Sequence, residues 1–327
     1  MQSLHISEPW MWFAFIAFVL AMLAVDLFVL GGRKAHRVSV REASSWVIAW
    51  STLAMVFAGL LWWYLEAEFG PEIARHKTLE FLTGYLIEQS LSIDNMFIFV
   101  MIFGYFAVPP ELQRRVLLYG VLGAIVMRGA MIFAGVWLVS QFTWLLYAFG
   151  VFLIITGIKM LLFAHQQPDL ARNPLLRWAQ GHLRITKKFH GEHFFVLQDG
   201  RRWATPMFLV LVLIEASDLM FAVDSIPAIF AITTDPFIVF TSNIFAIMGL
   251  RALYFLLADM ADRFHLLKYG LAIVLVFIGT KMTLMPWLHM PVEWSLAVVG
   301  GIILASVLLS LIKSRNKASD EDRMRMP

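Results

Sequence analysis

The stretch LVLVLIEASDLMFAVDSIPAIF, residues 209–230, decides the fold class. It is apolar and long enough to cross a bilayer as a helix, which takes about 20 residues. It nevertheless contains three carboxylates, Glu215, Asp218 and Asp224. Because an acid at the centre of a membrane helix costs about 2.5–3.5 kcal/mol on insertion scales, three acids in one span indicate a function inside the membrane.

A second stretch of the same kind lies upstream. Residues 81–103 read FLTGYLIEQSLSIDNMFIFVMIF and carry Glu88 and Asp94. In both stretches an acid, Glu88 or Asp218, is followed six residues later by aspartate and then by a small polar residue, Asn95 or Ser225. We interpret the two stretches as related helices that hold a cation within the membrane.

The composition supports a polytopic, all-α membrane protein. Of 327 residues, 60% are hydrophobic and only 15% are charged, which is too apolar for a soluble chain of this length. The absence of cysteine excludes disulfides, thiolate metal sites and thiol redox chemistry within this chain. The sequence contains no HExxH zinc motif and no Walker A motif. We therefore expect no enzyme, no prosthetic group and no coupling of transport to ATP.

Nine apolar segments have bilayer-spanning length. They lie at residues 11–30, 46–65, 81–103, 116–138, 144–163, 205–232, 237–258, 267–287 and 292–312. Lys and Arg concentrate in the odd-numbered loops and in the C-terminal tail, so the N-terminus is expected outside and the C-terminus in the cytoplasm. The long first apolar run precedes its basic cluster, which is typical of an uncleaved first span rather than a signal peptide.

The segments group into five parts. Residues 1–80 form two N-terminal membrane helices, 81–164 a first three-helix repeat, 165–203 a cytoplasmic loop, 204–287 a second three-helix repeat, and 288–327 the last membrane helix and the tail. Within the loop, Asp199-Gly200 between two short aromatic-rich runs indicates a β-hairpin, with an irregular basic loop as the alternative.

The two repeats share polar markers in the same order. Each has its pair of acids, then an arginine (Arg128 or Arg251), then a lysine followed by methionine (Lys159 or Lys281). Because three spans separate corresponding helices, the two units enter the membrane from opposite sides. Transporters with such inverted repeats place the substrate site near the membrane midplane.

The candidate metal ligands are all oxygen donors: Glu88, Asp94, Asn95, Glu215, Asp218 and Asp224. Oxygen donors suit hard cations such as Mn²⁺, Mg²⁺ or Ca²⁺. Arg128 and Arg251 are expected to brace the acids through ion pairs. The sequence leaves open whether Asp26, Asn243, Met96 or Met220 joins the site.

Helix geometry adds one further expectation. Acids six residues apart point about 120° apart on a regular helix, so two acids on one helix converge poorly. A helix break near Asp94-Asn95, and another near Pro227, would bring them together and free backbone carbonyls for a cation.

Three runs of residues carry a family resemblance. They are FLTGYLIEQSLSIDN, the stretch from ATPMFLVLVLIEASD to FAIMGLRALYF, and YGLAIVLVFIGTKM. These runs resemble the TerC family of integral membrane proteins, and within it the Alx-type members of bacterial inner membranes. The resemblance implies Mn²⁺ efflux or metal delivery to secreted enzymes, and the family has also been linked to tellurium resistance and redox modulation. By motif match it implies metal binding by Glu88, Asp94, Glu215, Asp218 and Asp224, with Asn95 adjacent.

From the sequence we predict an inner-membrane Mn²⁺ exporter driven by a proton or sodium gradient. Its expected partners are the transported divalent ion and the lipid bilayer, with no nucleic acid. One alternative is a membrane scaffold that passes metal to exported enzymes through protein partners, and another is a redox or tellurite-handling protein. The metal, the coupling ion and the oligomeric state stay open at this stage.

Overall fold

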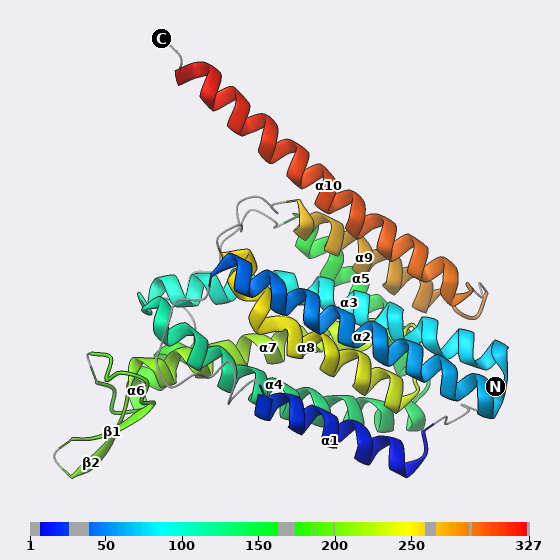
Figure 1. Ribbon diagram of the computed structural model, residues 1–327, viewed down its shortest axis with the longest axis horizontal. Helices are drawn as coiled ribbons and strands as arrows, with labels where there is room; N and C mark the ends of the chain where they lie inside the picture. The colour runs from blue at the N-terminus through cyan, green and yellow to red at the C-terminus, as the bar shows by residue number, and fades with distance from the viewer. Residues whose placement is uncertain are drawn as a thin grey trace.

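The computed structural model describes residues 7–25, 39–162, 174–186, 188–198, 200–258, 266–287 and 290–325. It is a bundle of long helices with a small hairpin at one end (Figure 1). The elements are α1 (Pro9–Val25), α2 (Val40–Phe69), α3 (Pro71–Tyr105), α4 (Pro110–Gln141), α5 (Leu145–Leu162), α6 (Pro174–His182), β1 (Phe195–Gln198), β2 (Arg201–Ala204), α7 (Pro206–Phe230), α8 (Pro236–Ala258), α9 (Leu267–Thr283) and α10 (Val292–Arg325).

The architecture confirms a polytopic, all-α membrane protein. Each of the nine predicted apolar segments overlaps one helix, from α1 to α5 and from α7 to α10. Seven helices in the described part of the chain are long and apolar enough to cross a membrane, whereas α1 and α9 have 17 residues each. The class is therefore established, and a count of nine spans stays a prediction.

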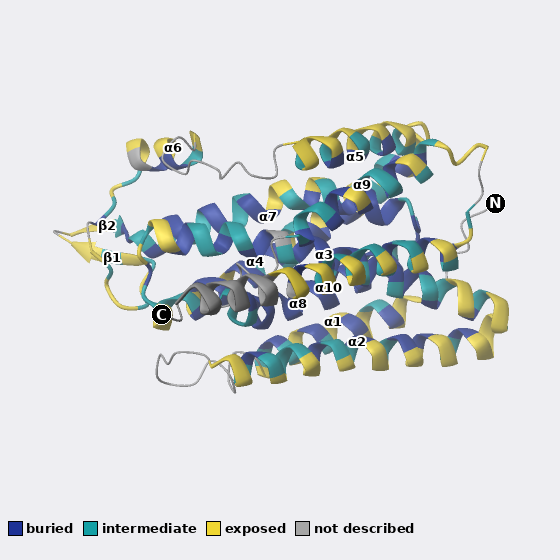
Figure 2. Ribbon diagram, turned by 90° about the horizontal axis from the view of Figure 1, so that it is seen from above, coloured by how far each residue is buried: buried dark blue, intermediate teal, exposed yellow. Residues whose placement is uncertain are grey.

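Helix α8 lies at the centre of the bundle. It packs against α2, α3 and α4, and 94% of its apolar span is buried inside the protein. Figure 2 shows α1 and α2 along one side of the bundle and α5 on the opposite side, with exposed residues facing outward. Large apolar side chains such as Phe13, Trp63 and Leu162 are exposed on these outer helices. Such a surface is suited to contact with lipid rather than water.

Helices α5 and α9 approach each other closely because glycine lines their contact. A Cβ atom on Gly279 would lie 2.6 Å from the carbonyl oxygen of Gly150, and one on Gly157 would lie 2.7 Å from that of Ala272. These contacts run in opposite directions along the two helices, so α5 and α9 are antiparallel. Close packing at small residues is the usual way in which membrane helices associate.

The contacts between helices follow the predicted repeat. Helix α3 packs on α7, α4 on α8 and α5 on α9, so each helix of the first unit contacts its counterpart in the second. The cross pairs α3 with α8 and α4 with α7 are also both in contact. This pattern supports an inverted repeat, although the symmetry itself stays a prediction.

The expected helix breaks are wrong. Helix α3 runs without interruption past residues 94 and 95, and α7 continues past Pro227 to Phe230. Residues 225–230 are all buried, and a break among them would leave backbone groups without partners in apolar surroundings. Pro227 lies in the last turn of α7, where the loss of one backbone donor disturbs the helix least.

The loop after α5 folds against one end of the bundle (Figure 1). Strands β1 and β2 form an antiparallel hairpin in which Phe195 pairs with Ala204 and Leu197 with Arg202. Ile185 lies alongside Ala204 as a parallel bridge. Leu176 and Ala179 of α6 are buried in the same apolar cluster as Met207 of α7. The loop is thus anchored to the start of α7.

Candidate functional site

Four buried polar residues meet in the interior of the bundle, one from each of α3, α4, α7 and α8. They are Glu88, Arg128, Asp218 and Asn243, which we call the central cluster. None of the four is more than 2% exposed. Each comes from a different helix, so the cluster depends on the packing of all four.

Arg128 holds the central cluster together. Its Nε donates to Oδ2 of Asp218 at 2.9 Å and its Nη2 donates to Oδ1 at 2.6 Å, so the guanidinium grips that carboxylate with two bonds. Nη1 forms an ion pair with Oε1 of Glu88 and donates to Oδ1 of Asn243 at 3.4 Å. The Asn243 amide in turn donates to Oε2 of Glu88 at 3.1 Å. Arg128 thereby links an acid of α3 to an acid of α7.

The charges of the cluster do not cancel. With all groups ionised, two carboxylates face one guanidinium, which leaves one negative charge in the interior. Removing an ion from water costs several kcal/mol, and the two-pronged contact with arginine offsets only part of that cost. A cation that enters this region is therefore attracted to it.

The other two acids of α7 point towards different neighbours. The carboxylate of Glu215 lies against Gly123 of α4, where a Cβ atom would be 2.0 Å from Oε1. Asp224 forms a hydrogen bond with Thr156 of α5 and lies near Lys159. The angular separation predicted for acids six residues apart is thus present, since Asp218 faces α4 and Asp224 faces α5.

Several buried polar groups have no hydrogen-bond partner among the described residues. They include both amide atoms of Asn95, the hydroxyl of Ser225 and Oε2 of Glu215. Asn95 and Ser225 are each 1% exposed and occupy corresponding positions after the second acid of each repeat. Unpartnered buried oxygens of this kind fit the chemistry of hard-cation ligands.

The described residues do not include a complete set of metal ligands in one place. Among them, no group of three or more His, Asp or Glu side chains lies close enough to hold a metal ion. The side chain of Asp94 and the whole of Asp26 lie outside the described residues. The assignment of Glu88, Asp94, Asn95, Glu215, Asp218 and Asp224 as metal ligands therefore stays a prediction.

The residues whose membership of the site the sequence left open lie in different places in the structure. Asn243 belongs to the central cluster. Met96 is buried in an apolar cluster with Phe99, and Met220 is 62% exposed on the outer surface of α7. Arg251 lines a small pocket with Glu42 and other residues of α2 and α4, apart from the four central residues. Its predicted role as a brace stays a prediction.

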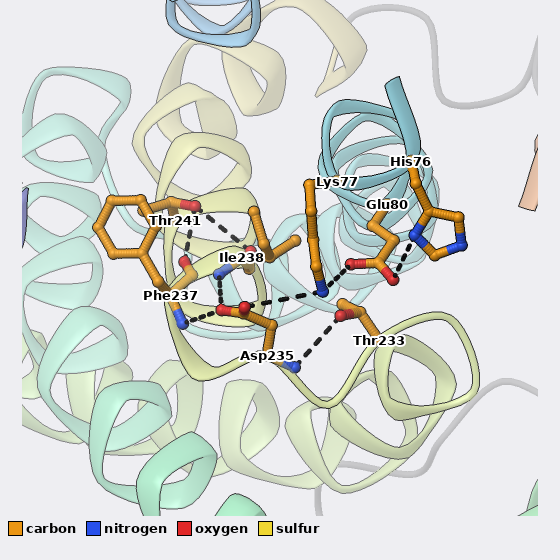
Figure 3. Close-up of polar contacts among 8 residues, drawn as sticks. All are labelled: His76, Lys77, Glu80, Thr233, Asp235, Phe237, Ile238 and Thr241. Carbon is orange, nitrogen blue, oxygen red and sulfur yellow. Dashed lines mark hydrogen bonds and ion pairs between the residues drawn. The ribbon is translucent and has the colours of Figure 1, made fainter. Parts of the chain in front are cut away.

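A second polar cluster lies where the N-terminal part of α3 meets the turn between α7 and α8 (Figure 3). This turn cluster consists of His76, Lys77, Glu80 and Asp235. Lys77 Nζ lies 2.9 Å from Oε2 of Glu80 and 3.7 Å from Oδ2 of Asp235, and Nδ1 of His76 lies 3.2 Å from Oε1 of Glu80. Glu80 and Asp235 are each only 4% exposed. Lys77 therefore links the start of α3 to the start of α8 near one end of the bundle.

Asp235 also determines where α8 begins. Its Oδ1 accepts hydrogen bonds from the backbone N–H groups of Phe237 at 3.0 Å and Ile238 at 3.3 Å, while Pro236 occupies the first helical position. Aspartate followed by proline is a typical helix start. That signal is visible in the sequence, but the contact between Asp235 and Lys77, 158 residues away in the chain, requires the packed structure.

Replacing Lys77 with methionine should destabilise the protein. The change leaves Glu80 and Asp235 buried without their shared lysine, and breaking a buried ion pair costs about 3–5 kcal/mol. Thermal unfolding in detergent measures the loss. Arg75→Met on the same helix is the control, because its pair with Glu293 is exposed and such pairs contribute about 0–1 kcal/mol. Equal melting temperatures for the two variants would contradict a structural role for the turn cluster.

Comparison with known proteins identifies the family of this chain. The family model described as "Integral membrane protein TerC family" matches residues 73–318, which include the central cluster and the turn cluster. The chain belongs to the TerC family. No solved structure matches the chain.

Relatives in this family match over nearly the full length. The chain is 54% identical to the "Putative membrane-bound redox modulator Alx" of Salmonella typhi. The match extends over 305 residues, which are 93% of this chain and 95% of the relative. The protein of the same name in Escherichia coli (strain K12) is 53% identical over the same shares. That of Photorhabdus laumondii is 50% identical over 315 residues, or 96% and 98% of the two chains. Neither the family description nor these names indicates a catalytic activity.

Proposed function

We propose that this TerC protein exports Mn²⁺ from the cytoplasm across the inner membrane. The observation that carries the proposal is the convergence of Glu88 of α3 and Asp218 of α7 on Arg128 inside an apolar helix bundle. Buried carboxylates of this kind are expensive to place in a membrane and mark ion pathways in transport proteins. Glu88 and Asp218 come from α3 and α7, the first helices of the two proposed repeats. Transporters commonly build their substrate site from both repeats, at the interface between them.

In the proposed cycle, Arg128 serves as the cation of the metal-free state. Its guanidinium pairs with both Glu88 and Asp218 when no ion is bound and balances one of their two negative charges. An entering divalent ion competes with it for those oxygens, and Glu215, three residues before Asp218, supplies a further carboxylate nearby. Asn95 offers an amide oxygen that no described residue uses. The acids thus pair with the guanidinium of Arg128 in the metal-free state and with the divalent ion in the loaded state.

The donor set favours a hard divalent cation. The candidate ligands are carboxylate and amide oxygens, which suit Mn²⁺, Mg²⁺ and Ca²⁺. Neither Met96, which is buried among apolar side chains, nor Met220, which is exposed, adds a sulfur donor to the central cluster. Manganese is the member of this group that the family resemblance implies. A gradient of protons or sodium is the proposed energy source, since the sequence contains no Walker A motif.

Direct flux in proteoliposomes tests the proposal. Purified protein is reconstituted into vesicles that contain a dye quenched by Mn²⁺, and the ion is added outside with and without a pH or sodium gradient. We expect Mn²⁺ entry that depends on the protein and is lost in the Glu88→Gln/Asp218→Asn variant, which removes both central carboxylates. Mg²⁺ and Ca²⁺ added in its place measure selectivity. Vesicles with folded protein that move no Mn²⁺ would contradict the proposal.

A second candidate function comes from the names of the relatives, which describe a redox modulator. The chain contains no cysteine, so a redox role based on thiols would require a partner protein. A membrane scaffold that hands metal to exported enzymes has the same requirement. Both alternatives predict no Mn²⁺ flux by the purified protein alone, so the vesicle experiment separates them from export.

The direction of export depends on the orientation in the membrane. We propose that the N-terminus is outside and that the loop with α6 and the β-hairpin is cytoplasmic, because basic residues concentrate in that loop. A reporter enzyme that is active only outside the cytoplasm should give no activity when inserted between residues 175 and 203. The same reporter inserted into the α4–α5 turn, residues 142–144, should be active. The reverse result would invert the orientation and turn export into import.

A further inference from the structure

The hairpin and the segment before it form a cleft at one end of the bundle, next to the start of α7. Leu183, Arg184, Phe195, Arg202 and Ala204 line it, and its volume is about 170 Å³. Three of these residues are apolar and two are arginines, so the cleft combines an apolar floor with a positive rim. We propose that this cleft binds the phosphate head group of an anionic phospholipid from the adjacent membrane leaflet.

Backbone hydrogen bonds fix the position of both arginines. Ala204 N–H donates to the carbonyl oxygen of Arg184 at 2.8 Å, and Thr186 N–H donates to that of Ala204 at 2.9 Å. The segment around Arg184 therefore runs alongside β2, which carries Arg202. Both residues are exposed, and neither guanidinium has a hydrogen-bond or ion-pair partner among the described residues. By contrast, Arg115 on α4 is paired with Glu192 of the same loop at 2.7 Å.

The cleft lies where the chain enters the membrane. Ala204 is separated by a single residue from Pro206, the first residue of α7. The ring of Phe195 contacts that of Phe208 in the first turn of α7, with 4.5 Å between ring centroids. The floor of the cleft is therefore continuous with a membrane helix, at the level expected for lipid phosphates. Acyl chains attached to such a phosphate would extend along α7.

The surroundings of the cleft also fit a lipid surface. Phe195 is 52% exposed, Leu197 is 75% exposed, and Trp178 of the neighbouring α6 is 55% exposed. Aromatic side chains are enriched at the membrane–water interface, and grouped exposed apolar side chains indicate a surface that something covers. Arginine binds phosphate with two parallel hydrogen bonds, and basic pockets beside membrane helices bind acidic head groups.

Native mass spectrometry of the purified full-length protein tests this proposal. Protein in detergent is titrated with phosphatidylglycerol, with phosphatidylcholine and with inorganic phosphate. We expect the wild type to retain phosphatidylglycerol in preference to phosphatidylcholine. Arg184→Gln/Arg202→Gln should weaken phosphatidylglycerol binding by about 30-fold, the effect of two basic residues at an anionic surface. Millimolar inorganic phosphate should not displace the lipid.

A matched variant separates the cleft from general charge attraction. Arg177→Gln/Arg201→Gln removes two exposed arginines of the same loop that do not line the cleft and should leave lipid binding unchanged. Equal loss in both double variants, equal binding of the two lipids, or displacement by phosphate would each overturn the proposal. Should the cleft variant fold poorly, as judged by circular dichroism, Arg202→Gln and Arg201→Gln decide the question, because these neighbours point to opposite faces of β2.

Discussion

Replacing Arg128 with methionine is expected to remove most of the folded protein from the membrane. The change leaves Glu88 and Asp218 facing each other in the interior without the guanidinium that now pairs with both. Breaking a buried ion pair costs about 3–5 kcal/mol, and here one residue pairs with two acids. That loss is comparable with the whole stability of many proteins, about 5–15 kcal/mol. Protein amount in membranes and thermal unfolding in detergent measure it.

Three variants give this prediction its controls. Arg115→Met, on the same helix, breaks an exposed pair with Glu192 and a contact with the exposed ring of Tyr119, and should change stability by about 1–2 kcal/mol at most. Arg128→Lys keeps the charge but loses the two-pronged contact, so an intermediate effect is expected. Adding Glu88→Gln and Asp218→Asn to Arg128→Met removes the uncompensated charges and should restore part of the folded protein. If Arg128→Met unfolds like the wild type, the central cluster is not structural.

The sequence predicts much of this fold because helix formation and membrane insertion are local properties. Length and hydropathy place nine segments on nine helices, and the acids of residues 209–230 mark α7 as a candidate for function. The link between Arg128 and the membrane acids also follows from charge alone, since an arginine in a bilayer needs a partner. These features depend on residues near one another in the chain or on a simple balance of charge.

Other features depend on packing and are not accessible from the sequence. The spacing of Glu215, Asp218 and Asp224 gives their angles around α7 but not which neighbouring helix each one meets. Asn243 joins the central cluster because α8 lies at the middle of the bundle, which no local pattern indicates. The predicted break at Pro227 is wrong because a tightly packed last turn tolerates proline. Lys77 and Asp235 meet only because the first turns of α3 and the turn before α8 lie side by side.

Neutralising one acid of each repeat should abolish Mn²⁺ export while the protein remains folded. Asp224 is half-buried and held by Thr156 rather than by Arg128, so Asp224→Asn leaves the central cluster intact. Asp94 corresponds to it in the first repeat, and Asp94→Asn is expected to behave alike. We expect Mn²⁺ flux to fall by more than about 100-fold in each variant, because even partners outside the ligand shell contribute about 10–100-fold in metal sites.

Flux must be compared with the amount of folded protein, because one kind of variant should lose flux and the other should lose folded protein. The Asp94→Asn and Asp224→Asn proteins should accumulate and melt like the wild type yet transport no Mn²⁺, whereas Arg128→Met should be lost from the membrane. Glu72→Gln, an exposed acid in the first turn of α3, is the control and should change neither quantity. Normal export by both Asn variants would show that the ion does not use these acids. The path would then have to run through Glu88, Glu215 and Asp218, where the negative charge left over by Arg128 lies.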